Sequence, residues 1–379
     1  MKKILEDWDG QTPERQRKIR EAFSDGRFAV HALPFTMQVG LMEPEGMARS
    51  FVYSSELARM AGKPLPTGAK MTDVPSYSRL TPTLLRHAGV TFLHLGCNPG
   101  SPPPEVPFLF WWEGPDGSRL LTIYSANYGS EVLPPDGWKY KTWLAMVMGS
   151  DNKPAPSPEE VRADLQKIRK HFPDVKIRIG SLSDFAERID REDLSDLPVI
   201  GKDMPDSWIH GPMSDPEGML LARKSVPQLL AAEALDTLLG TWDLPRDDIT
   251  PCLEAGYENS ILFYEHTWGG AIDWVCKYLP AENNAGRVSN WFYGEQWRED
   301  LKTSKFDRHK ISWEEHTDYA RQVNRLVSDA LQPRLETLAK AGDVLSHRTV
   351  AFNPVPWKRD AVIGGTLVRD IPAGGYKAL

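Results

Sequence analysis

Asp73 and His266 are the residues of this chain whose type and neighbours most strongly suggest chemistry. Asp73 lies in residues 71–78, where one acid comes just before a stretch of helical character. His266 lies in residues 263–270, an aromatic run that ends in two glycines. A carboxylate can serve as a nucleophile or a metal ligand, and an imidazole is a common metal ligand. Since a catalytic metal needs about three protein ligands, these two residues would supply only part of its site.

A second acidic segment lies between them in the sequence. Asp203 and Asp206 stand on either side of a proline and are followed by Trp208. A carboxyl group beside aromatic rings is partly desolvated, which raises its pKa and suits it to general acid catalysis. The segment could equally be a polar loop that leads into a helix capped by Ser214 or Asp215. The sequence context does not choose between the two candidate acids.

Each candidate also has a purely structural explanation. Asp73 could cap the helix expected to begin near Ser78, because Asp is a favoured N-cap residue. His266 could be a hydrogen-bonded core residue among its aromatic neighbours, and His31, which lies just before Leu33, is a similar case. Residue type and spacing alone leave both explanations open.

Aromatic residues are a further candidate group, because the chain holds 13 Trp residues. Flat aromatic rings pack in protein cores, and they also stack on the faces of sugar rings. Tyr128 follows the end of an expected strand, and Trp112 and Trp268 flank the motifs above. We expect at least one of these three rings to lie beside a bound carbohydrate, with core packing as the alternative.

The composition is that of a globular protein of 379 residues, with 41% hydrophobic and 26% charged residues. A net charge of −7 argues against a nucleic-acid partner, because phosphate binding requires a basic surface. No apolar stretch of about 18 residues predicts a membrane span. The start of the chain lacks a signal-peptide core, and three cysteines without a C-x-x-C pair fit a reducing compartment. These features favour a cytoplasmic protein.

Strands and helices alternate along roughly the first 200 residues, which predicts an α/β fold with parallel strands. Strands are expected at residues 28–33, 90–95, 108–112, 119–124 and 175–179, and helices at 12–23, 45–62, 80–87 and 157–171. A Gly-Pro-Asp-Gly turn at 114–117 predicts a hairpin.

The pattern changes after residue 211. Two long amphipathic helices are expected at 217–242 and 312–341, and strand-like runs begin at 349. We therefore predict an α/β domain at residues 1–215, a helical bundle at 216–345 and the start of a β-domain at 346–379.

Four motifs together resemble those of the glycoside hydrolase family 38 α-mannosidases. Residues 73–89 are similar to that family's nucleophile segment, in which Asp-Pro-Phe-Gly-His-Ser leads to a Pro, two Leu and an Ala-Gly. Residues 206–211 resemble its acid-aromatic-Trp segment, 263–266 its Phe-Gln-His-His zinc-binding stretch, and 353–357 the Asn-Pro-Leu-Ser-Trp that opens its β-sandwich. The likeness is strongest to a bacterial branch with His-Ala-Leu-Pro-Phe and Glu-His-Thr-Trp-Gly, which stand here at 31–35 and 265–269.

The resemblance implies a partial (β/α)7-type barrel, a helical bundle and the first strands of a β-sandwich. It also implies a zinc-dependent retaining hydrolase whose carbohydrate substrate carries an α-linked, mannose-like sugar. Asp73 would be the nucleophile and, with His266, a zinc ligand, whereas Asp206 would be the general acid/base with Asp203 as the alternative. The expected substrate-binding residues are Trp208, Tyr128, Trp268, His31 and Asp203.

One departure from the family pattern concerns the zinc site. The family's first strand carries a His-x-Asp pair that provides two zinc ligands, and no such strand precedes the helix at residue 12. We therefore interpret the chain as an internal piece of a longer protein that binds zinc weakly and is inactive alone. The alternatives are another metal hydrolase on a similar barrel, such as a deacetylase, and a metal-free sugar-binding or scaffold protein. A homo-oligomer is compatible with each of these interpretations.

Overall fold

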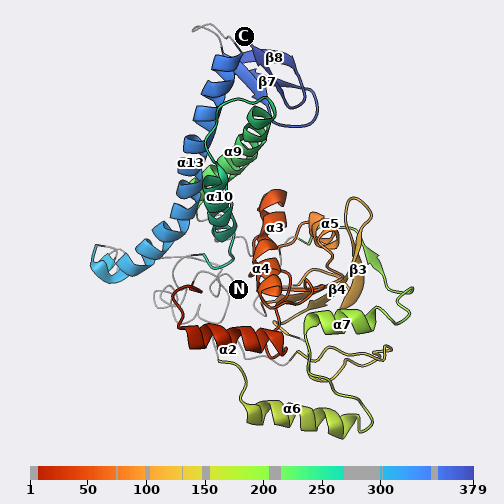
Figure 1. Ribbon diagram of the computed structural model, residues 1–379. Coiled ribbons are helices and arrows are strands. Elements are labelled where there is room, and N and C mark those ends of the chain that lie inside the picture. The colour runs from red at the N-terminus through yellow and green to blue at the C-terminus, as the bar shows by residue number, and fades with distance from the viewer. Residues whose placement is uncertain are drawn as a thin grey trace. The chain divides into compact units, whose positions relative to one another are not determined.

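The computed structural model describes residues 7–73, 76–98, 103–129, 131–146, 154–204, 215–268, 299–300, 302–342 and 349–379. The chain forms two compact units, which are described separately here (Figure 1). The first comprises Met1–His210 together with Tyr264–His266, and the second comprises Gly211–Phe263 together with Thr267–Leu379. A short later segment of the sequence thus belongs to the first unit.

A five-stranded sheet lies at the centre of the first unit. Its strands are β1 (Gly68–Asp73), β2 (Phe92–Cys97), β3 (Leu109–Glu113), β4 (Arg119–Ser125) and β5 (Val199–Ile200), in the order β1-β2-β4-β3-β5. β1, β2 and β4 run parallel, whereas β3 is antiparallel to β4 and parallel to β5. The prediction of an α/β fold built on parallel strands is confirmed at this level.

The hairpin between β3 and β4 follows from its turn residues. Gly117 has a φ of +82°, a conformation that glycine adopts without steric cost. The Gly114 N–H donates to the Ser118 carbonyl at 2.9 Å, which closes the turn. The hairpin predicted from residues 114–117 is therefore present.

Capping residues set the starts of two surface helices of the first unit. Thr12 accepts a hydrogen bond from the Arg15 N–H and begins α2 (Pro13–Ser24). Ser157 and Glu160 form a capping box that begins α6 (Pro158–His171). In both helices proline stands in the first turn, where its missing N–H costs nothing.

Helix α7 (Leu182–Ile189) covers one face of the sheet. Phe185 and Ile189 pack against Phe92 of β2, and the Phe185 and Phe92 rings meet edge to face at 4.9 Å. This cluster also contains side chains of β3 and β4, so it anchors three strands at once. The other helices among the described residues of the unit are α3 (Pro44–Ser50), α4 (Val52–Met60) and α5 (Leu80–His87).

Three sequence predictions in this unit are wrong. Residues 175–179 form no strand: Ile179 is 81% exposed, and alternating polarity makes a strand only where a neighbour offers hydrogen bonds. Residues 28–33 also form no strand, since Pro34 ends the run and only Ala32 N–H bonds β1, at the Gly68 carbonyl. The helix expected at 45–62 is two helices, and the Ser50 hydroxyl donates to the Met47 carbonyl just before the break.

The second unit contains α9 (Pro216–Thr241), α10 (Thr250–Phe263) and α13 (Asp307–Ala341), preceded by a 3-10 turn η2 (Ser304–Phe306). Leu229 of α9, Leu253 of α10 and Val327 of α13 belong to one buried apolar cluster. The Asp215 side chain accepts the Gly218 N–H and caps α9. Helix α13 begins earlier than the predicted residue 312, at Asp307.

Two small antiparallel sheets close the described part of the second unit. β6 (Val350–Asn353) pairs with β9 (Gly375–Ala378), and β7 (Arg359–Ile363) pairs with β8 (Thr366–Ile371). The β-sandwich and the partial (β/α)7-type barrel implied by the family resemblance stay predictions.

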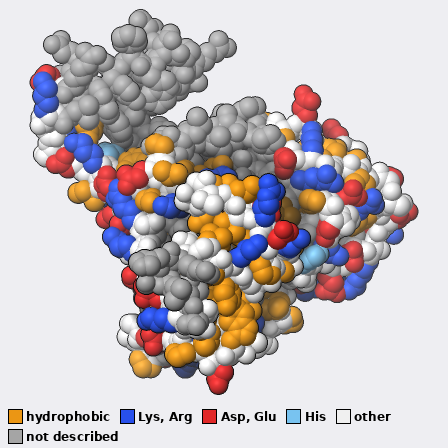
Figure 2. Space-filling view, turned by 90° about the horizontal axis from the view of Figure 1, so that it is seen from above, with side chains coloured by type: hydrophobic (Ala, Val, Ile, Leu, Met, Phe, Trp, Pro, Cys, Tyr) orange, Lys and Arg blue, Asp and Glu red, His pale blue; other side chains and the backbone are white. Residues whose placement is uncertain are grey.

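The surface and the helices bear on possible partners. Among the described residues, no helix is both long and apolar enough to cross a membrane. On the face seen in Figure 2, Lys and Arg side chains are interspersed with Asp and Glu. The described residues of that face therefore form no extended basic surface of the kind that binds nucleic acid.

Candidate functional site

Asp73 is the last residue of β1 and lies at the carboxyl edge of the parallel strands. It pairs with Cys97, the last residue of β2, and its carbonyl accepts the Asn98 N–H at 3.3 Å. Asp73 has a φ of +78°, the left-handed region that few residues other than glycine adopt. Helix α5 begins only at Leu80 after Arg79, so Asp73 does not cap it. The structural explanation considered for Asp73 is therefore wrong.

Three side chains hold the Asp73 carboxylate. Oδ1 accepts hydrogen bonds from Asn98 Nδ2 at 2.8 Å and from the Tyr128 hydroxyl at 2.9 Å. Oδ2 lies 3.0 Å from His266 Nε2. The other imidazole nitrogen of His266, Nδ1, lies 2.7 Å from Glu265 Oε1. Asn98, Tyr128 and His266 therefore fix the orientation of one carboxylate from both of its oxygens, and Glu265 holds the far side of the His266 ring.

Backbone contacts bring the His266 segment to β1. The Gln38 N–H donates to the Tyr264 carbonyl at 2.8 Å, and the His266 N–H donates to the Thr36 carbonyl at 3.1 Å. Thr36 is itself tied to β1, because its hydroxyl accepts the Thr72 N–H at 3.0 Å. Residues 32–38 therefore lie along the outer edge of β1 and hold His266 beside Asp73.

The charges of Asp73 and His266 reinforce each other. Burial would lower the pKa of His266, but its hydrogen bonds to Asp73 and Glu265 outweigh burial and raise the pKa to about 9. Burial likewise opposes the charge of Asp73, while the hydrogen bonds from His266, Asn98 and Tyr128 lower its pKa below the ordinary value. At neutral pH the pair is therefore an aspartate and an imidazolium.

A partly buried lysine, Lys70, contacts the backbone of Tyr128. Lys70 Nζ donates to the Tyr128 carbonyl at 2.6 Å and lies 3.1 Å from His94 Nδ1, on the neighbouring strand. Burial lowers the pKa of Lys70 to about 7. Burial and the nearby Lys70 charge also lower the pKa of His31 to about 4, so His31 is neutral.

The other predicted site residues fall into two groups. Asp206 and Trp208 lie outside the described residues. Asp203 is described, and its Oδ1 accepts the Arg79 N–H at 2.6 Å, just before α5, so it fixes the start of a helix. His31 Nδ1 accepts the Leu33 N–H at 3.3 Å, a local contact.

Two of the three candidate stacking rings are buried. Trp112 of β3 is fully buried, and its Nε1 donates to the Lys202 carbonyl at 3.0 Å. Trp268 is buried in the second unit, where its ring lies 4.1 Å from that of His316. Neither offers a free face to a sugar, because both rings are enclosed by protein. Only Tyr128 of the three meets Asp73.

Three residues around the site, Asn98, Glu265 and Lys70, were not predicted. Asn98 could have been found, because it directly follows a strand parallel to β1 and side chains at such ends share one edge. Glu265 directly precedes His266 in the Glu-His-Thr-Trp-Gly motif. Lys70 stands among apolar residues of β1, and a charged residue inside a strand of that kind is a signal in itself.

Asp73 and His266 are the candidate zinc ligands, and a catalytic zinc site needs about three protein ligands. Asp73 Oδ2 and His266 Nε2 are two donor atoms, and they bond each other directly. Among the described residues no group of three or more His, Cys, Asp or Glu side chains is arranged to hold a metal ion. The described residues therefore do not form a complete zinc site.

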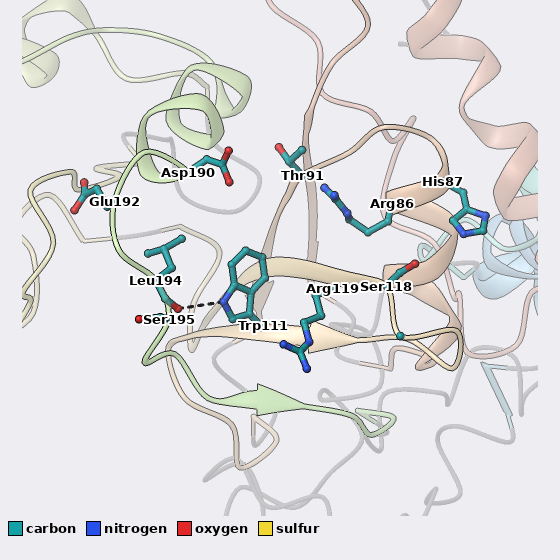
Figure 3. A pocket seen from close by; sticks show the side chains of 11 residues that line it. Arg86, His87, Thr91, Trp111, Ser118, Arg119, Asp190, Glu192, Leu194 and Ser195 are labelled. Atoms are coloured by element: carbon teal, nitrogen blue, oxygen red, sulfur yellow. Dashed lines mark hydrogen bonds between the residues drawn. The ribbon is translucent and has the colours of Figure 1, made fainter.

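A cavity of about 850 Å³ lies at the other end of the sheet (Figure 3). It is bordered by Thr91, which precedes β2, and by Arg119, the first residue of β4. Asp73 lies at the opposite ends of these parallel strands. This cavity is therefore separate from the Asp73 site.

Comparisons with known proteins add to this geometry. No protein-family model matches the chain. The solved structure of an alpha-mannosidase from Enterococcus faecalis V583 superposes with a TM-score of 0.58 at 15% identity, over 95% of this chain and 40% of that chain. The chain shares the fold of an alpha-mannosidase. This likeness concerns the fold alone, because the identity is low.

A curated relative is also similar in sequence. A "Putative mannosylglycerate hydrolase" of Halalkalibacterium halodurans is 23% identical over 225 residues, which is 52% of this chain and 25% of that protein. The chain thus spans about a quarter of this relative over the matched region and less than half of the solved structure.

Proposed function

We propose that the chain carries the nucleophile of a retaining glycoside hydrolase that acts on an α-linked, mannose-like sugar. The observation that supports this most is the carboxylate of Asp73, which three donors hold at the carboxyl edge of a parallel sheet. Catalytic residues of α/β folds lie at this edge. The likeness to an alpha-mannosidase fold and to a mannosylglycerate hydrolase points to the same chemistry.

The reaction follows from the chemistry of the carboxylate. Asp73, ionised at neutral pH, attacks the anomeric carbon and forms a covalent glycosyl-enzyme, which water then hydrolyses. Asn98, Tyr128 and His266 hold the carboxylate in place and stabilise its charge as it leaves the sugar in the second step. A second carboxyl group protonates the leaving oxygen, a role we assign to Asp206 with Asp203 as the alternative.

We propose zinc dependence on the basis of the family resemblance alone. Asp73 and His266 would be two ligands, and the others would have to come from outside the described residues. With two ligands the chain should bind zinc weakly, because affinity rises with the number of preorganised ligands. Dialysis against excess zinc followed by metal analysis tests this, and about one tightly bound zinc per chain would contradict it.

The nucleophile is tested by covalent trapping. The 379-residue chain is incubated with an activated fluorinated mannoside, and its peptides are analysed by mass spectrometry. We expect one glycosyl group on the peptide that contains Asp73 and none in Asp73→Asn. A label on another carboxylate, or equal labelling of the variant, would refute the assignment.

A metal-free sugar-binding protein is the second candidate. In such a protein Asp73 and His266 would stay hydrogen-bonded to each other and would contact the sugar directly. Such a protein would bind methyl α-mannoside without cleaving aryl α-mannosides and without forming the covalent adduct. A metal-dependent deacetylase would instead release acetate from acetylated sugars, also without a label on Asp73.

A further inference from the structure

The cavity at the amino-terminal end of the parallel strands is a second place where this molecule offers chemistry to a ligand (Figure 3). Arg86 is in the last turn of α5, Arg119 begins β4, and Asp190 caps the end of α7. β1 and β2 each span six residues, about 20 Å, so a ligand here is far from Asp73. The cavity and the Asp73 carboxylate therefore cannot contact the same sugar ring.

An aromatic ring lies at the centre of the cavity. Trp111 of β3 projects from the sheet toward the space bordered by Asp190 and Arg86 (Figure 3). Its Nε1 donates to the Leu194 carbonyl at 3.3 Å, which fixes the orientation of the indole. Trp111 is only partly buried, in contrast to Trp112, its fully buried neighbour. A fixed, partly open indole is a flat apolar surface on which a ring of C–H groups can stack.

Charged groups of both signs surround this indole. The Arg86 guanidinium is anchored by one bond to the Val90 carbonyl at 3.2 Å, and that of Arg119 by one bond to Glu113 at 2.8 Å. Each guanidinium carries five N–H donors, so both keep donors for a ligand. Asp190 supplies a carboxylate acceptor on the other side, whereas the Glu192 carboxylate already accepts the Lys141 N–H at 2.7 Å.

This mixture of groups selects the chemical class of the ligand. Two guanidinium groups alone would favour a phosphate or another anion. Asp190 and the Glu113 carboxylate that pairs with Arg119 offset that charge and disfavour an anion, and Asp190 can accept hydrogen bonds from hydroxyl groups. A saccharide-like ring can stack its C–H face on the indole of Trp111, while its hydroxyl groups accept hydrogen bonds from the guanidinium groups and donate to the carboxylate.

We propose that this cavity, lined by Trp111, Arg86, Arg119, Asp190 and Glu192, binds a neutral saccharide ring at a site distinct from Asp73. The inference does not depend on the proposed hydrolase function. A saccharide bound here would hold a longer carbohydrate on the protein while another part of it occupies the Asp73 site.

The test measures saccharide binding where Asp73 cannot contribute. Asp73→Asn is titrated with methyl α-mannoside and with an α-linked mannotriose, using saturation-transfer NMR and calorimetry. In this background we expect binding to persist. Arg86→Met and Asp190→Ala should each weaken saccharide binding at least five-fold, because each removes hydrogen-bonding groups from the cavity. Both side chains are exposed, so neither substitution should disturb the core. Arg162→Met on α6, an exposed arginine paired with Glu159, is the matched control and should bind as the parent does.

Trp111 also packs against the α7 cluster, so Trp111→Leu is used only if circular dichroism shows that it folds. Loss of saccharide binding in the two surface variants, with the control unchanged, supports the proposal. Equal binding in all variants, or no binding of either sugar at tens of millimolar, would overturn it. Stronger binding of inorganic phosphate than of saccharide would also overturn it. Covalent labelling of Asp73 is measured independently of saccharide binding in this cavity. A failure of the cavity proposal can therefore be told apart from a failure of the hydrolase proposal.

Discussion

His266 Nε2 lies 3.0 Å from Asp73 Oδ2, although 193 residues of sequence separate the two side chains. The contact is built from backbone hydrogen bonds that tie residues 264–266 to residues 36–38, and those to β1. The pair therefore reports whether the first unit has assembled around β1.

Asp73→Asn should lower the pKa of His266. The substitution removes the negative charge that, with Glu265, raises the pKa of His266 to about 9. Asn tolerates the left-handed backbone of Asp73, so the fold should persist. We expect the His266 pKa to fall by about one unit or more, measured from its ring resonances by NMR in the presence of a chelator. An unchanged His266 pKa would contradict the ion pair.

The backbone at Asp73 predicts a second difference. Asp73→Val should be less stable than Asp73→Asn by about 1–2 kcal/mol, because a β-branched residue is strained at a φ of +78°. Asn can still accept the hydrogen bonds from Asn98 and Tyr128, so Asp73→Gly, which lacks these bonds but tolerates this φ, is the second reference that isolates the backbone. Urea unfolding of the three proteins measures the difference. Equal stability would mean that Asp73 does not hold this conformation.

Stability between pH 7 and 9 should reflect two opposing groups. The folded-state pKa of His266, about 9, is above its ordinary value of 6.5, so its contribution is full below pH 6.5 and is lost as pH rises through 9. The folded-state pKa of Lys70, about 7, is below its ordinary value of 10.5. The unfolded chain therefore holds the extra proton between pH 7 and 10.5, and Lys70 makes stability rise with pH in that range.

Two substitutions, Lys70→Met and His266→Gln, separate the contributions of these groups to stability. In metal-free protein, Lys70→Met should show stability that falls from pH 7 to 9, by an amount on the order of 1–2 kcal/mol. His266→Gln should show stability that rises over the same interval, and the parent should lie between them. Urea unfolding at several pH values provides the measurement. Parallel curves for the two variants would refute the assignment.

The Tyr128 hydroxyl should help to keep Asp73 ionised. Tyr128→Phe leaves Oδ1 of Asp73 with the Asn98 donor, so the pKa of Asp73 should rise and the protein should lose about 1 kcal/mol of stability. The carboxyl carbon resonance of Asp73 reports the pKa. Tyr140→Phe removes a hydroxyl that lies 3.5 Å from Asp196 at the surface, and it should have little effect. A pKa of Asp73 equal to that of the parent would exclude this role for Tyr128.

The second unit contains a buried ion pair whose loss should be costly. Arg334 of α13 has a side chain only 7% exposed and lies 2.7 Å from Asp236 of α9. Asp236→Ala would leave this guanidinium buried without its carboxylate, so we expect a loss of about 3–5 kcal/mol. The control is Asp318→Ala, which breaks an exposed pair with Arg325 at 3.5 Å and should cost less than about 1 kcal/mol. Thermal unfolding compares them, and similar losses would contradict the prediction.

The parts of the fold that were predictable from sequence depend on neighbours in the chain. The Ser157–Glu160 capping box and the turn at 114–117 are specified by a few adjacent residues, and both are present. The strand expected at 175–179 failed because a strand needs a partner elsewhere, and alternating residues do not name one. The start of α13 at Asp307 was missed because its first turns lack a clear capping residue.

The candidate site shows the same limit. Asp73 and His266 could be selected from residue type and motif. Residue type and motif do not reveal that Asn98 and Tyr128 both donate hydrogen bonds to Oδ1 of Asp73. Trp268 looked suited to stacking on a sugar, yet its ring is buried against His316. Exposure of an aromatic ring is decided by tertiary packing, which a local run of residues does not encode.

The Tyr264–His266 segment also sets the order in which the molecule can be completed. A ribosome adds about 5–20 residues per second, so the 193 residues between Asp73 and His266 take about 10–40 s to synthesise. During that interval β1, β2 and β4 can pair, while Asp73 has Asn98 and Tyr128 but no imidazole. The ribosome must then add the residues of α9 and α10 before residues 264–266 are available to bond the segment beside β1. The Asp73 centre is therefore among the last contacts of the first unit to form on a nascent chain.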